Sequence, residues 1–437
     1  MPRLPADCVL LPLARGRLLV SRAQATFCRV DEPDVSAVEQ ALGGAPIAQS
    51  LAKDLERHGF FGAARQAEPE THTVQLQLTN ACNLGCVYCC TNSGAPRKQE
   101  LSRERWLALI DEIRASMGQG TRVSLLGGEP FLVPFAIEVA ERIQEVGLDL
   151  GVFSNGLLFR DEALATRVAA LVKRGANVRV SLAGASRESC DSLSGAARFD
   201  LAIEGVQRLA QLGARVTIDL MLSPQQADQI GRDLPRLRSL LPAGTPLALG
   251  VIFQGGRELG ERVFSSRADL ERALDAIAFE AGESIASVPA SPVAFRRDGC
   301  SCALGHHLHA RSDGALFTCF KMEERVGDLA VESFSEALAR VRASPRPATL
   351  LEFCRECALA TLCGGGCRAE NIQLTGDPER PACGEWRLRV LAELLAEDRP
   401  SALEWPAMQL LREAQLRGIE APEALVPARP SQHLLDT

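Results

Sequence analysis

Three cysteines lie close together in the run Leu78-Thr79-Asn80-Ala81-Cys82-Asn83-Leu84-Gly85-Cys86-Val87-Tyr88-Cys89, separated by three and then two residues. A cubane 4Fe-4S cluster normally takes one cysteine thiolate per iron, so three thiolates leave one iron open to another ligand. Structural zinc is the alternative, but it needs four ligands and usually takes them from two C-x-x-C pairs. The spacing therefore favours a cluster that takes part in chemistry, with zinc as the second interpretation.

The composition indicates a large soluble enzyme. The chain has 437 residues, of which 46% are hydrophobic, and a formal net charge of −7. This length allows two to four domains, and no basic run is long enough to follow a phosphate backbone. No stretch resembles a transmembrane span of about 20 apolar residues, and the apolar stretch 8–13 is too short for a signal peptide. We expect a cytoplasmic protein with no nucleic-acid or membrane partner.

The fifteen cysteines of the chain indicate metal ligands rather than disulfides, because a reducing cytosol disfavours disulfides. Four cysteines lack metal-binding spacing and are expected to pack in the interior; these are Cys8, Cys28, Cys90 and Cys190. A C-terminal group adds eight thiolates, the number that two fully ligated 4Fe-4S clusters need. Its members are Cys300, Cys302, Cys319, Cys354, Cys357, Cys363, Cys367 and Cys383.

Between the two cysteine regions, short β-branched runs alternate with longer amphipathic stretches. The expected strands are 74–78, 122–126, 151–154, 178–182, 216–222 and 248–253. The expected helices are 103–117, 134–146, 162–173, 201–212 and 225–241. Six such units in a row predict an α/β fold with a parallel sheet and helices outside it. The first cysteine group then follows the first strand, at the strand ends where chemistry gathers in βα barrels.

Glycine-rich and polar residues follow the next three expected strands. Gly127-Gly128-Glu129-Pro130 comes directly after the second strand, Asn155 follows the third, and Ser181 ends the fourth. Two glycines let the backbone approach a ligand closely, while carbonyl groups and the Glu129 carboxylate offer acceptors to an ammonium group. An ordinary β-turn is the alternative for the tetrapeptide, because Gly and Pro are common in turns.

The three-cysteine run, with the aromatic Tyr88 before its last cysteine, resembles the radical S-adenosylmethionine (SAM) enzymes. The resemblance implies a partial (β/α)6 barrel in which SAM chelates the open iron held by Cys82, Cys86 and Cys89. An electron from the cluster then cleaves SAM to a 5′-deoxyadenosyl radical. It also implies SAM contacts at Gly127, Gly128, Glu129, Pro130, Asn155 and Ser181.

Two positions qualify this resemblance. The family often has an aspartate where this chain has Ala183, which leaves a contact there in doubt. The segment 253–256 could close over the adenine of SAM, and a plain strand-end turn is the alternative.

The spacing of the C-terminal cysteines resembles the SPASM domain, an extension of many radical SAM enzymes that modify peptides and proteins. The resemblance implies two auxiliary 4Fe-4S clusters and therefore three clusters in all. It assigns Cys302, Cys319 and Cys367 to one auxiliary cluster, and Cys354, Cys357, Cys363 and Cys383 to the other. Cys300 is the candidate fourth ligand of the first; its one-residue separation from Cys302 makes that assignment geometrically demanding, so an open iron there is the alternative.

The N-terminal pattern reads as two strands, 16–21 and 26–30, followed by helices at 34–42 and 47–58. This order resembles the winged-helix-like RiPP recognition element, which binds the leader of a ribosomally made peptide as an added strand. A structural cap on the barrel is the alternative. The expected domains are 1–70 for this module, 71–295 for the barrel, 296–390 for the SPASM domain and 391–437 for C-terminal helices and a tail.

These resemblances imply a peptide maturase that abstracts a hydrogen from a precursor peptide and installs an oxidative modification or crosslink, such as a C–C, C–O or thioether bond. The implied partners are the precursor peptide and an electron donor such as flavodoxin or ferredoxin. One alternative is a maturase of the anaerobic sulfatase type, but those enzymes carry an Asp base where this chain has Phe320. A non-catalytic zinc or iron-sulfur scaffold is the other. No catalytic base is assigned from the sequence.

Overall fold

The structure is a computed structural model, and it describes residues 2–12, 17–21, 24, 26–61, 72–258, 260, 262–264, 272–274, 276–277, 306–343, 351, 354 and 365–381. The chain divides into two compact units. One comprises residues 70–290 and 305–343, and the other comprises residues 1–69, 291–304 and 344–437.

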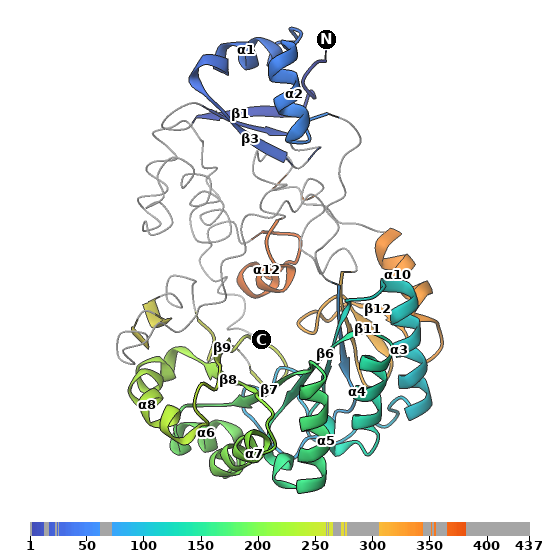
Figure 1. The fold of residues 1–437 in the computed structure, drawn as a ribbon, viewed down its shortest axis with the longest axis vertical. Coiled ribbons are helices and arrows are strands. Elements are labelled where there is room, and N and C mark those ends of the chain that lie inside the picture. The colour runs from blue at the N-terminus through green and yellow to red at the C-terminus, as the bar shows by residue number, and fades with distance from the viewer. Residues whose placement is uncertain are drawn as a thin grey trace. The chain divides into compact units, whose positions relative to one another are not determined.

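A parallel sheet forms the centre of the unit that begins at residue 70 (Figure 1). Its strands are β4 (Thr73–Gln77), β5 (Arg122–Leu126), β6 (Asp149–Ser154), β7 (Asn177–Leu182), β8 (Thr217–Leu222) and β9 (Leu247–Val251). They lie side by side in chain order, and each pairs in parallel with the next. The six-stranded parallel sheet predicted from the sequence is therefore present.

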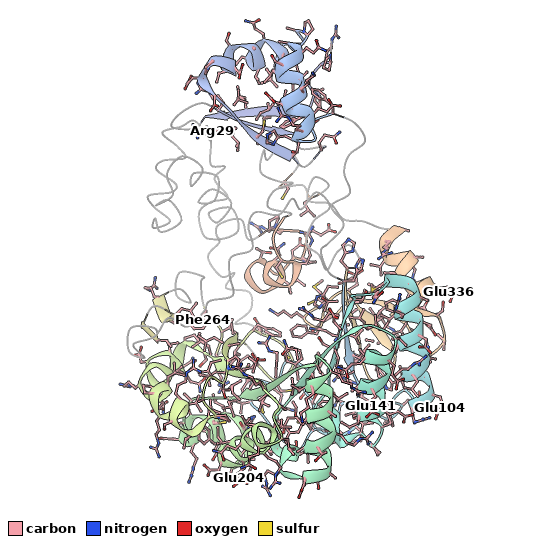
Figure 2. All side chains as sticks on the ribbon, in the orientation of Figure 1. Arg29, Glu104, Glu141, Glu204, Phe264 and Glu336 are labelled. Carbon is pink, nitrogen blue, oxygen red and sulfur yellow. The ribbon has the colours of Figure 1, made fainter. Side chains whose placement is uncertain are left out.

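Helices cover the outer face of this sheet (Figure 1). They are α3 (Arg103–Met117), α4 (Ala136–Glu145), α5 (Glu162–Lys173), α6 (Arg187–Ser194), α7 (Phe199–Gln211) and α8 (Ala227–Leu240), with short 3-10 turns at Pro130–Leu132, Leu157–Arg160 and Pro224–Gln226. Their apolar faces and alternate strand residues form one buried core that includes Val74, Trp106 and Val180. Charged side chains such as Glu104, Glu141 and Glu204 extend outward from the helices (Figure 2).

The short helix α6 was not predicted. Its sequence, RESCDSLS, is polar and has few apolar residues at helical spacing. A capping box stabilises its start instead: the Ser186 side chain accepts a hydrogen bond from the Ser189 amide, and the Ser189 side chain accepts one from the Ser186 amide. Gly195 ends the helix in the left-handed conformation.

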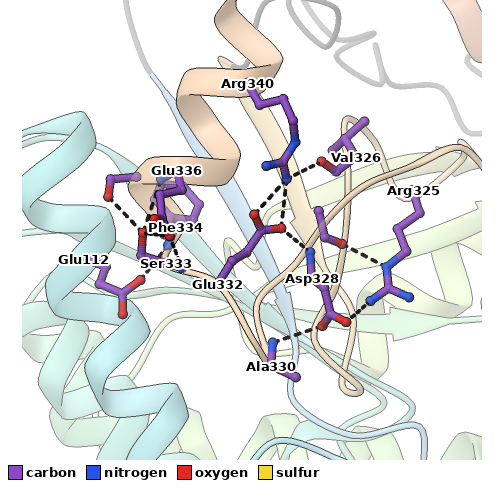
Figure 3. Close-up of polar contacts among 12 residues, drawn as sticks. Glu112, Arg325, Val326, Asp328, Ala330, Glu332, Ser333, Phe334, Glu336 and Arg340 are labelled. Atoms are coloured by element: carbon purple, nitrogen blue, oxygen red, sulfur yellow. Dashed lines mark hydrogen bonds and ion pairs between the residues drawn. The ribbon is translucent and has the colours of Figure 1, made fainter.

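Three further strands extend the same sheet beyond β4. They are β10 (His307–Ala310), β11 (Ala315–Phe317) and β12 (Arg325–Asp328). β10 pairs in parallel with β4, and the next two strands continue antiparallel. Helix α10 (Phe334–Ala343) follows them. Figure 3 shows how charged contacts fix this helix: Arg340 pairs with Glu332 at 2.8 Å, and the Phe334 amide donates to the Glu112 carboxylate of α3 at 2.6 Å.

The N-terminal part contains a three-stranded antiparallel sheet and two helices. The strands are β1 (Cys8–Pro12), β2 (Arg17–Ser21) and β3 (Thr26–Val30), in the order β1-β2-β3. The helices are α1 (Glu32–Leu42) and α2 (Gln49–Arg57). β1 was not among the predicted strands, because its continuous apolar run lacks strand alternation. The described elements have a core of their own that contains Cys8 and Cys28, so these two cysteines pack as predicted.

Helix α12 (Arg368–Thr375) also belongs to the unit that contains the N-terminal part, and Cys367 is its N-cap residue. Cys190 lies in the barrel core, again as predicted for a packing cysteine. Among the helices that the structure describes, none combines the length and apolar character needed to cross a membrane.

Candidate functional site

The loops that follow β4, β5, β6 and β7 meet at one edge of the sheet, because these four parallel strands are neighbours. The first of these loops carries Cys82, Cys86 and Cys89, which we call the cysteine loop and define as residues 80–94. The Gly127–Pro130 turn follows β5, and Asn155 follows β6. Ser181 is the second-last residue of β7. The structure therefore brings together the SAM contacts and the three cysteines that were predicted from the sequence.

The cysteine loop is closed at its base. A parallel β-bridge joins Ala81 to Gly94, the Cys82 amide donates to Gly94 O at 2.8 Å, and the Gly94 amide donates to Asn80 O at 2.9 Å. The Glu100 carboxylate adds a second anchor, since it accepts hydrogen bonds from the Asn80 amide at 2.7 Å and the Thr79 hydroxyl at 2.8 Å. These contacts hold the two ends of the loop together.

The three loop cysteines are free thiols and partly exposed. Burial raises the pKa of the Cys82 thiol to about 11. Burial also acts to raise the pKa of Cys89, but hydrogen bonds from Thr91 and from the Ser93 amide, together with the charge of Arg257, bring this pKa below its ordinary value. Donors directed at a sulfur favour its thiolate form, which is the form that binds metal.

Within the part of the chain that the structure describes, no three His, Cys, Asp or Glu side chains converge closely enough to enclose a single metal ion. A cubane binds each thiolate through a different iron, so its ligands stand further apart than those of one ion. Three free, partly exposed thiols on one loop fit such a cluster.

The Gly127-Gly128 backbone lies directly against the cysteine loop. The Gly128 amide donates to Thr79 O at 2.9 Å, and the Glu129 amide donates to Ala81 O at 2.8 Å. A Cβ atom on Gly128 would overlap Ala81 O and lie 2.7 Å from the Cβ of Cys82. The carbonyl oxygens of Gly127 and Gly128 accept no hydrogen bond from other described residues. These oxygens are therefore available to an ammonium group bound next to the cysteines.

The Glu129 side chain points into the protein and is fully buried. Its carboxylate accepts hydrogen bonds from the Asn155 amide at 2.8 Å, the Ser154 hydroxyl at 3.0 Å and the Phe131 amide at 3.3 Å. Burial raises the pKa of Glu129 to about 7, although these hydrogen bonds and the charge of Arg198 act in the opposite direction. Glu129 thus joins the ends of β5 and β6, and its carboxylate accepts hydrogen bonds from the protein where the sequence predicted an ammonium group of SAM.

Asn155 and Ser181 lie at the ends of the next two strands. The Asn155 side-chain amide donates to the Asn83 side chain of the cysteine loop at 2.7 Å. The Ser181 hydroxyl donates to Ser154 O at 3.4 Å, which is a weak contact. Asn155 therefore connects the end of β6 to the cysteine loop. Among the described residues, the Ser181 hydroxyl makes only this weak hydrogen bond to the protein.

Sequence reasoning did not identify Arg198, which is the N-cap residue of α7 and only 1% exposed. Its guanidinium donates to Ser181 O and, at 3.3 Å, to Asn155 O. The Nε and Nη1 groups find no partner among the described residues. A buried cation with unmet donors is costly unless an anion binds it. Its position before a helix gave no motif signal, so only the fold could identify it.

The segment 253–256 contacts protein groups at the same edge. The Phe253 ring packs edge-on against Phe320 with ring centroids 5.3 Å apart, and Lys321 Nζ lies 4.0 Å from the Phe253 centroid. The turn that follows Phe253 packs against the cysteine loop through Gly256 and Arg257.

Three of the C-terminal cysteines lie within the described residues. Cys319 follows β11 and is buried, Cys354 is buried, and Cys367 is half-buried. Cys300, Cys302, Cys357, Cys363 and Cys383 lie outside the described residues, so their assignment to auxiliary clusters stays a prediction.

Part of the chain is similar to known proteins. Residues 76–237 match the family model of the Radical SAM superfamily. Over 190 residues the chain is 30% identical to the sporulation killing factor maturation protein SkfB of Bacillus subtilis, covering 42% of this chain and 45% of that protein. Over 155 residues it is 34% identical to the mycofactocin maturase MftC of Mycobacterium tuberculosis, covering 35% of this chain and 38% of that protein. The chain thus matches less than half the length of these curated relatives.

Two solved structures share the fold. Streptococcus suis SuiB bound to precursor peptide SuiA superposes with a TM-score of 0.53 at 14% identity, covering 87% of this chain and 98% of that one. Native anSMEcpe with bound AdoMet gives a TM-score of 0.55 at 15% identity, covering 80% of this chain and all of that one (100%). At such low identity these similarities establish the fold alone. The family match and the site geometry together identify residues 76–237 as a radical SAM domain.

Proposed function

We propose that this protein is a radical SAM peptide maturase, which makes a 5′-deoxyadenosyl radical and uses it to abstract a hydrogen from a ribosomally made precursor peptide. The observation that carries the proposal is the meeting of three free thiols, glycine carbonyls that accept no bond from the described residues, and a buried guanidinium at adjacent strand ends. A cluster with SAM bound to its open iron would supply the radical chemistry, while the protein orients the substrate and excludes water.

The chain's own residues divide the recognition of SAM between them. Cys82, Cys86 and Cys89 would hold the cluster. The carbonyl oxygens of Gly127 and Gly128 would accept hydrogen bonds from the SAM ammonium group, which needs acceptors. The unmet donors of Arg198 would bind the SAM carboxylate, because a guanidinium pairs well with a carboxylate.

Four neighbouring residues would complete the SAM-binding pocket. Ser181, whose carbonyl already accepts from Arg198, would place its hydroxyl beside the same ligand. Glu129, Pro130 and Asn155 would shape the pocket: Glu129 by joining strand ends, and Asn155 by its bond to the cysteine loop.

The C-terminal cysteines support a SPASM domain with two auxiliary 4Fe-4S clusters. Removing a hydrogen atom and then forming a new bond releases a second electron, which auxiliary clusters held by these cysteines would accept. An electron donor such as flavodoxin or ferredoxin would reduce the SAM-binding cluster. A chain with three clusters contains about twelve irons.

The N-terminal module would bind the leader of the precursor peptide. Its sheet has two outer strands, β1 and β3, and an extended peptide can join such an edge by backbone hydrogen bonds. The curated relatives support a maturase, since both are named as maturation proteins and cover part of this chain. A winged-helix-like recognition element remains our interpretation of this module.

The position after Cys319 argues against the sulfatase-type alternative. That chemistry needs a base directly after the matching cysteine, and Phe320 offers an aromatic ring packed on Phe253 instead. We therefore favour a peptide crosslink or similar oxidative modification over formylglycine formation.

The test is coexpression with a short peptide encoded by a neighbouring reading frame, followed by mass spectrometry of the peptide. We expect a mass change or deuterium exchange that depends on SAM and a reductant. The reconstituted protein should hold about twelve irons and release 5′-deoxyadenosine, and replacing Cys86 with alanine should abolish that release. Zinc in place of iron, with no SAM cleavage, would refute the proposal.

A further inference from the structure

A tight turn after β9 carries Arg257 onto the cysteine loop. Gly255 and Glu258 form a β-bridge in which each amide donates to the other's carbonyl oxygen at 3.0 Å. The buried Glu258 carboxylate then accepts hydrogen bonds from the Gly260 and Arg262 amides, both at 3.0 Å. These contacts define the shape of the turn independently of the cysteine loop, so the turn presents Arg257 in a fixed direction.

Arg257 contacts the loop at four atoms. Its amide donates to Cys89 O at 2.9 Å, and its Nε donates to Cys86 O at 2.8 Å. Its Nη1 donates to Ser93 O at 2.6 Å and to the Asn92 side chain at 3.3 Å. The acceptors lie on both sides of Cys89, and a planar guanidinium fixes several acceptors at once better than a lysine does.

The neighbouring glycine makes this approach possible. Gly256 has φ +59°, a conformation that favours glycine, and a Cβ atom there would overlap the carbonyl oxygens of Cys89 and Cys90. Only a residue without a side chain lets the turn come this close to the loop.

Arg257 also brings a positive charge to the cysteine loop, because its guanidinium donates to Cys86 O at 2.8 Å and to Ser93 O at 2.6 Å. A fixed cation favours negative charge nearby, and a cluster becomes more negative when it gains an electron. The cation therefore makes reduction easier, because net charge and hydrogen bonding set the potential of such clusters.

We propose that Arg257 is a positioning residue that holds the cysteine loop around its cluster and raises the reduction potential of that cluster. This inference rests on the proposed function, since it takes the cysteine loop to be the cluster site. Arg257 acts through the loop backbone and its charge, and no contact with SAM or the peptide is assigned to it.

The experiment compares wild-type protein with Arg257→Lys and Arg257→Gln, using the full-length protein reconstituted with iron and sulfide. The control is Arg236→Gln, which removes one positive charge from an exposed position on α8. Electron paramagnetic resonance identifies the cluster with an open iron, because its signal changes when SAM is added. Two quantities are measured on that signal: its midpoint potential and its rate of loss to a chelator.

We expect Arg257→Lys to lose the cluster roughly 10- to 100-fold faster than wild type, because it loses two or three hydrogen bonds, with little change in potential. Arg257→Gln should lose the cluster similarly fast and shift the potential to a lower value. Arg236→Gln should match wild type in both. Thermal unfolding of each protein identifies a variant that does not fold. If Arg257→Gln does not fold, Arg257→Lys, which keeps the charge, still tests whether Arg257 holds the cysteine loop in place.

Two outcomes would contradict the inference in different ways. Wild-type protein that takes up no SAM-responsive cluster would refute the proposed function and this role with it. Wild-type protein that takes up the cluster, with both Arg257 variants equal to it in loss rate and potential, would refute the role of Arg257 alone.

Discussion

Single residues at the sheet edge have narrow steric and electrostatic tolerances. Gly128 has no room for a side chain, because a Cβ atom would overlap Ala81 O. Arg198 is buried with two donor groups that the described residues do not satisfy. Glycine is required where the backbone approaches a ligand or another strand closely, and a buried cation requires a partner anion. Each residue therefore gives a sharp test of the site.

Replacing Arg198 with methionine should weaken SAM binding by a factor of about 10 to 100, since a lost hydrogen bond to a charged group costs about 1.5–3 kcal/mol. Equilibrium dialysis of the reconstituted protein with labelled SAM measures the change. The matched control is Arg187→Met, which changes an exposed arginine on α6 that pairs with Asp200 at 2.6 Å. Equal SAM affinity in the Arg198 variant and wild type would remove the carboxylate contact from the proposal.

Replacing Gly128 with alanine should lower the free energy of unfolding by about 1–3 kcal/mol, because a methyl group is forced into a filled space. Gly85→Ala is the control, since a Cβ atom there meets no other atom within 4 Å. Denaturant unfolding of the metal-free proteins measures both. Equal stability of the two variants would mean that the Gly127–Pro130 turn can move away from the cysteine loop at little cost.

At the scale of elements, the site depends on contacts between segments that are distant in sequence. Glu100 connects the base of the cysteine loop to the turn between β10 and β11, because its carboxylate also accepts from the Ser312 hydroxyl at 3.0 Å. Glu112 and Arg105 connect α3 to the start of α10: Arg105 Nη1 lies 2.6 Å from Glu112 and its Nε donates to Leu329 O at 2.7 Å. Residues 306–343 are therefore attached to the rest of this unit at two places, through Glu100 and through helix α3.

The Glu100 anchor should depend on pH. Burial acts to raise its pKa, but hydrogen bonds from the Asn80 and Arg97 amides and from Thr79 and Ser312 lower it below the ordinary 4.5. A carboxyl group with a depressed folded-state pKa stabilises the protein above 4.5 and loses this contribution as pH falls through its folded-state pKa. Wild type should therefore exceed Glu100→Gln in stability at pH 6, with the difference shrinking in acid. Urea unfolding across this range measures it, and a difference independent of pH would contradict the assignment.

The contact between α3 and α10 should contribute measurable stability. Glu112→Ala removes the acceptor of the Phe334 amide at 2.6 Å and of Arg105, so we expect a loss of about 1–3 kcal/mol in the free energy of unfolding. Glu141→Ala is the control, because Glu141 pairs with Arg167 at 3.2 Å on the surface, where a pair contributes about 0–1 kcal/mol. If both variants lose the same amount, the Glu112 contact behaves as an ordinary surface pair.

At the scale of the whole molecule, the chain combines separate cores. The described N-terminal elements bury Leu19, Val38 and Phe60 among themselves, whereas the barrel has its own larger core. A module with its own core can be removed without opening another. Substrate binding and radical formation can therefore be tested separately.

Deleting residues 1–61 should abolish binding of the precursor peptide while leaving SAM cleavage intact, because the cysteine loop and its partners lie in the other unit. Fluorescence anisotropy with the labelled peptide measures binding, and release of 5′-deoxyadenosine measures cleavage. Undiminished peptide affinity in the shortened protein would favour the alternative of a structural cap.

Features that depend on neighbouring residues could be predicted from the amino-acid sequence. These features are local patterns: the three-cysteine spacing, the glycine pair at 127–128, and the alternation of strands and helices. Strands and helices repeat every two and about 3.6 residues, so a short stretch of sequence is enough to indicate them. Helix α3 and strand β5 consequently have the predicted bounds. The polar helix α6 and the apolar strand β1 were missed because they lack that periodicity.

Tertiary structure alone decided which distant residues meet. Arg198 at the strand ends, Arg257 on the cysteine loop and β10 beside β4 all result from chain segments that pair across the fold. Their partners are largely backbone carbonyls and amides, which every residue type carries and no sequence motif records. The sequence thus specified a set of thiols for a cluster, and the fold supplied the cations and anchors that surround them.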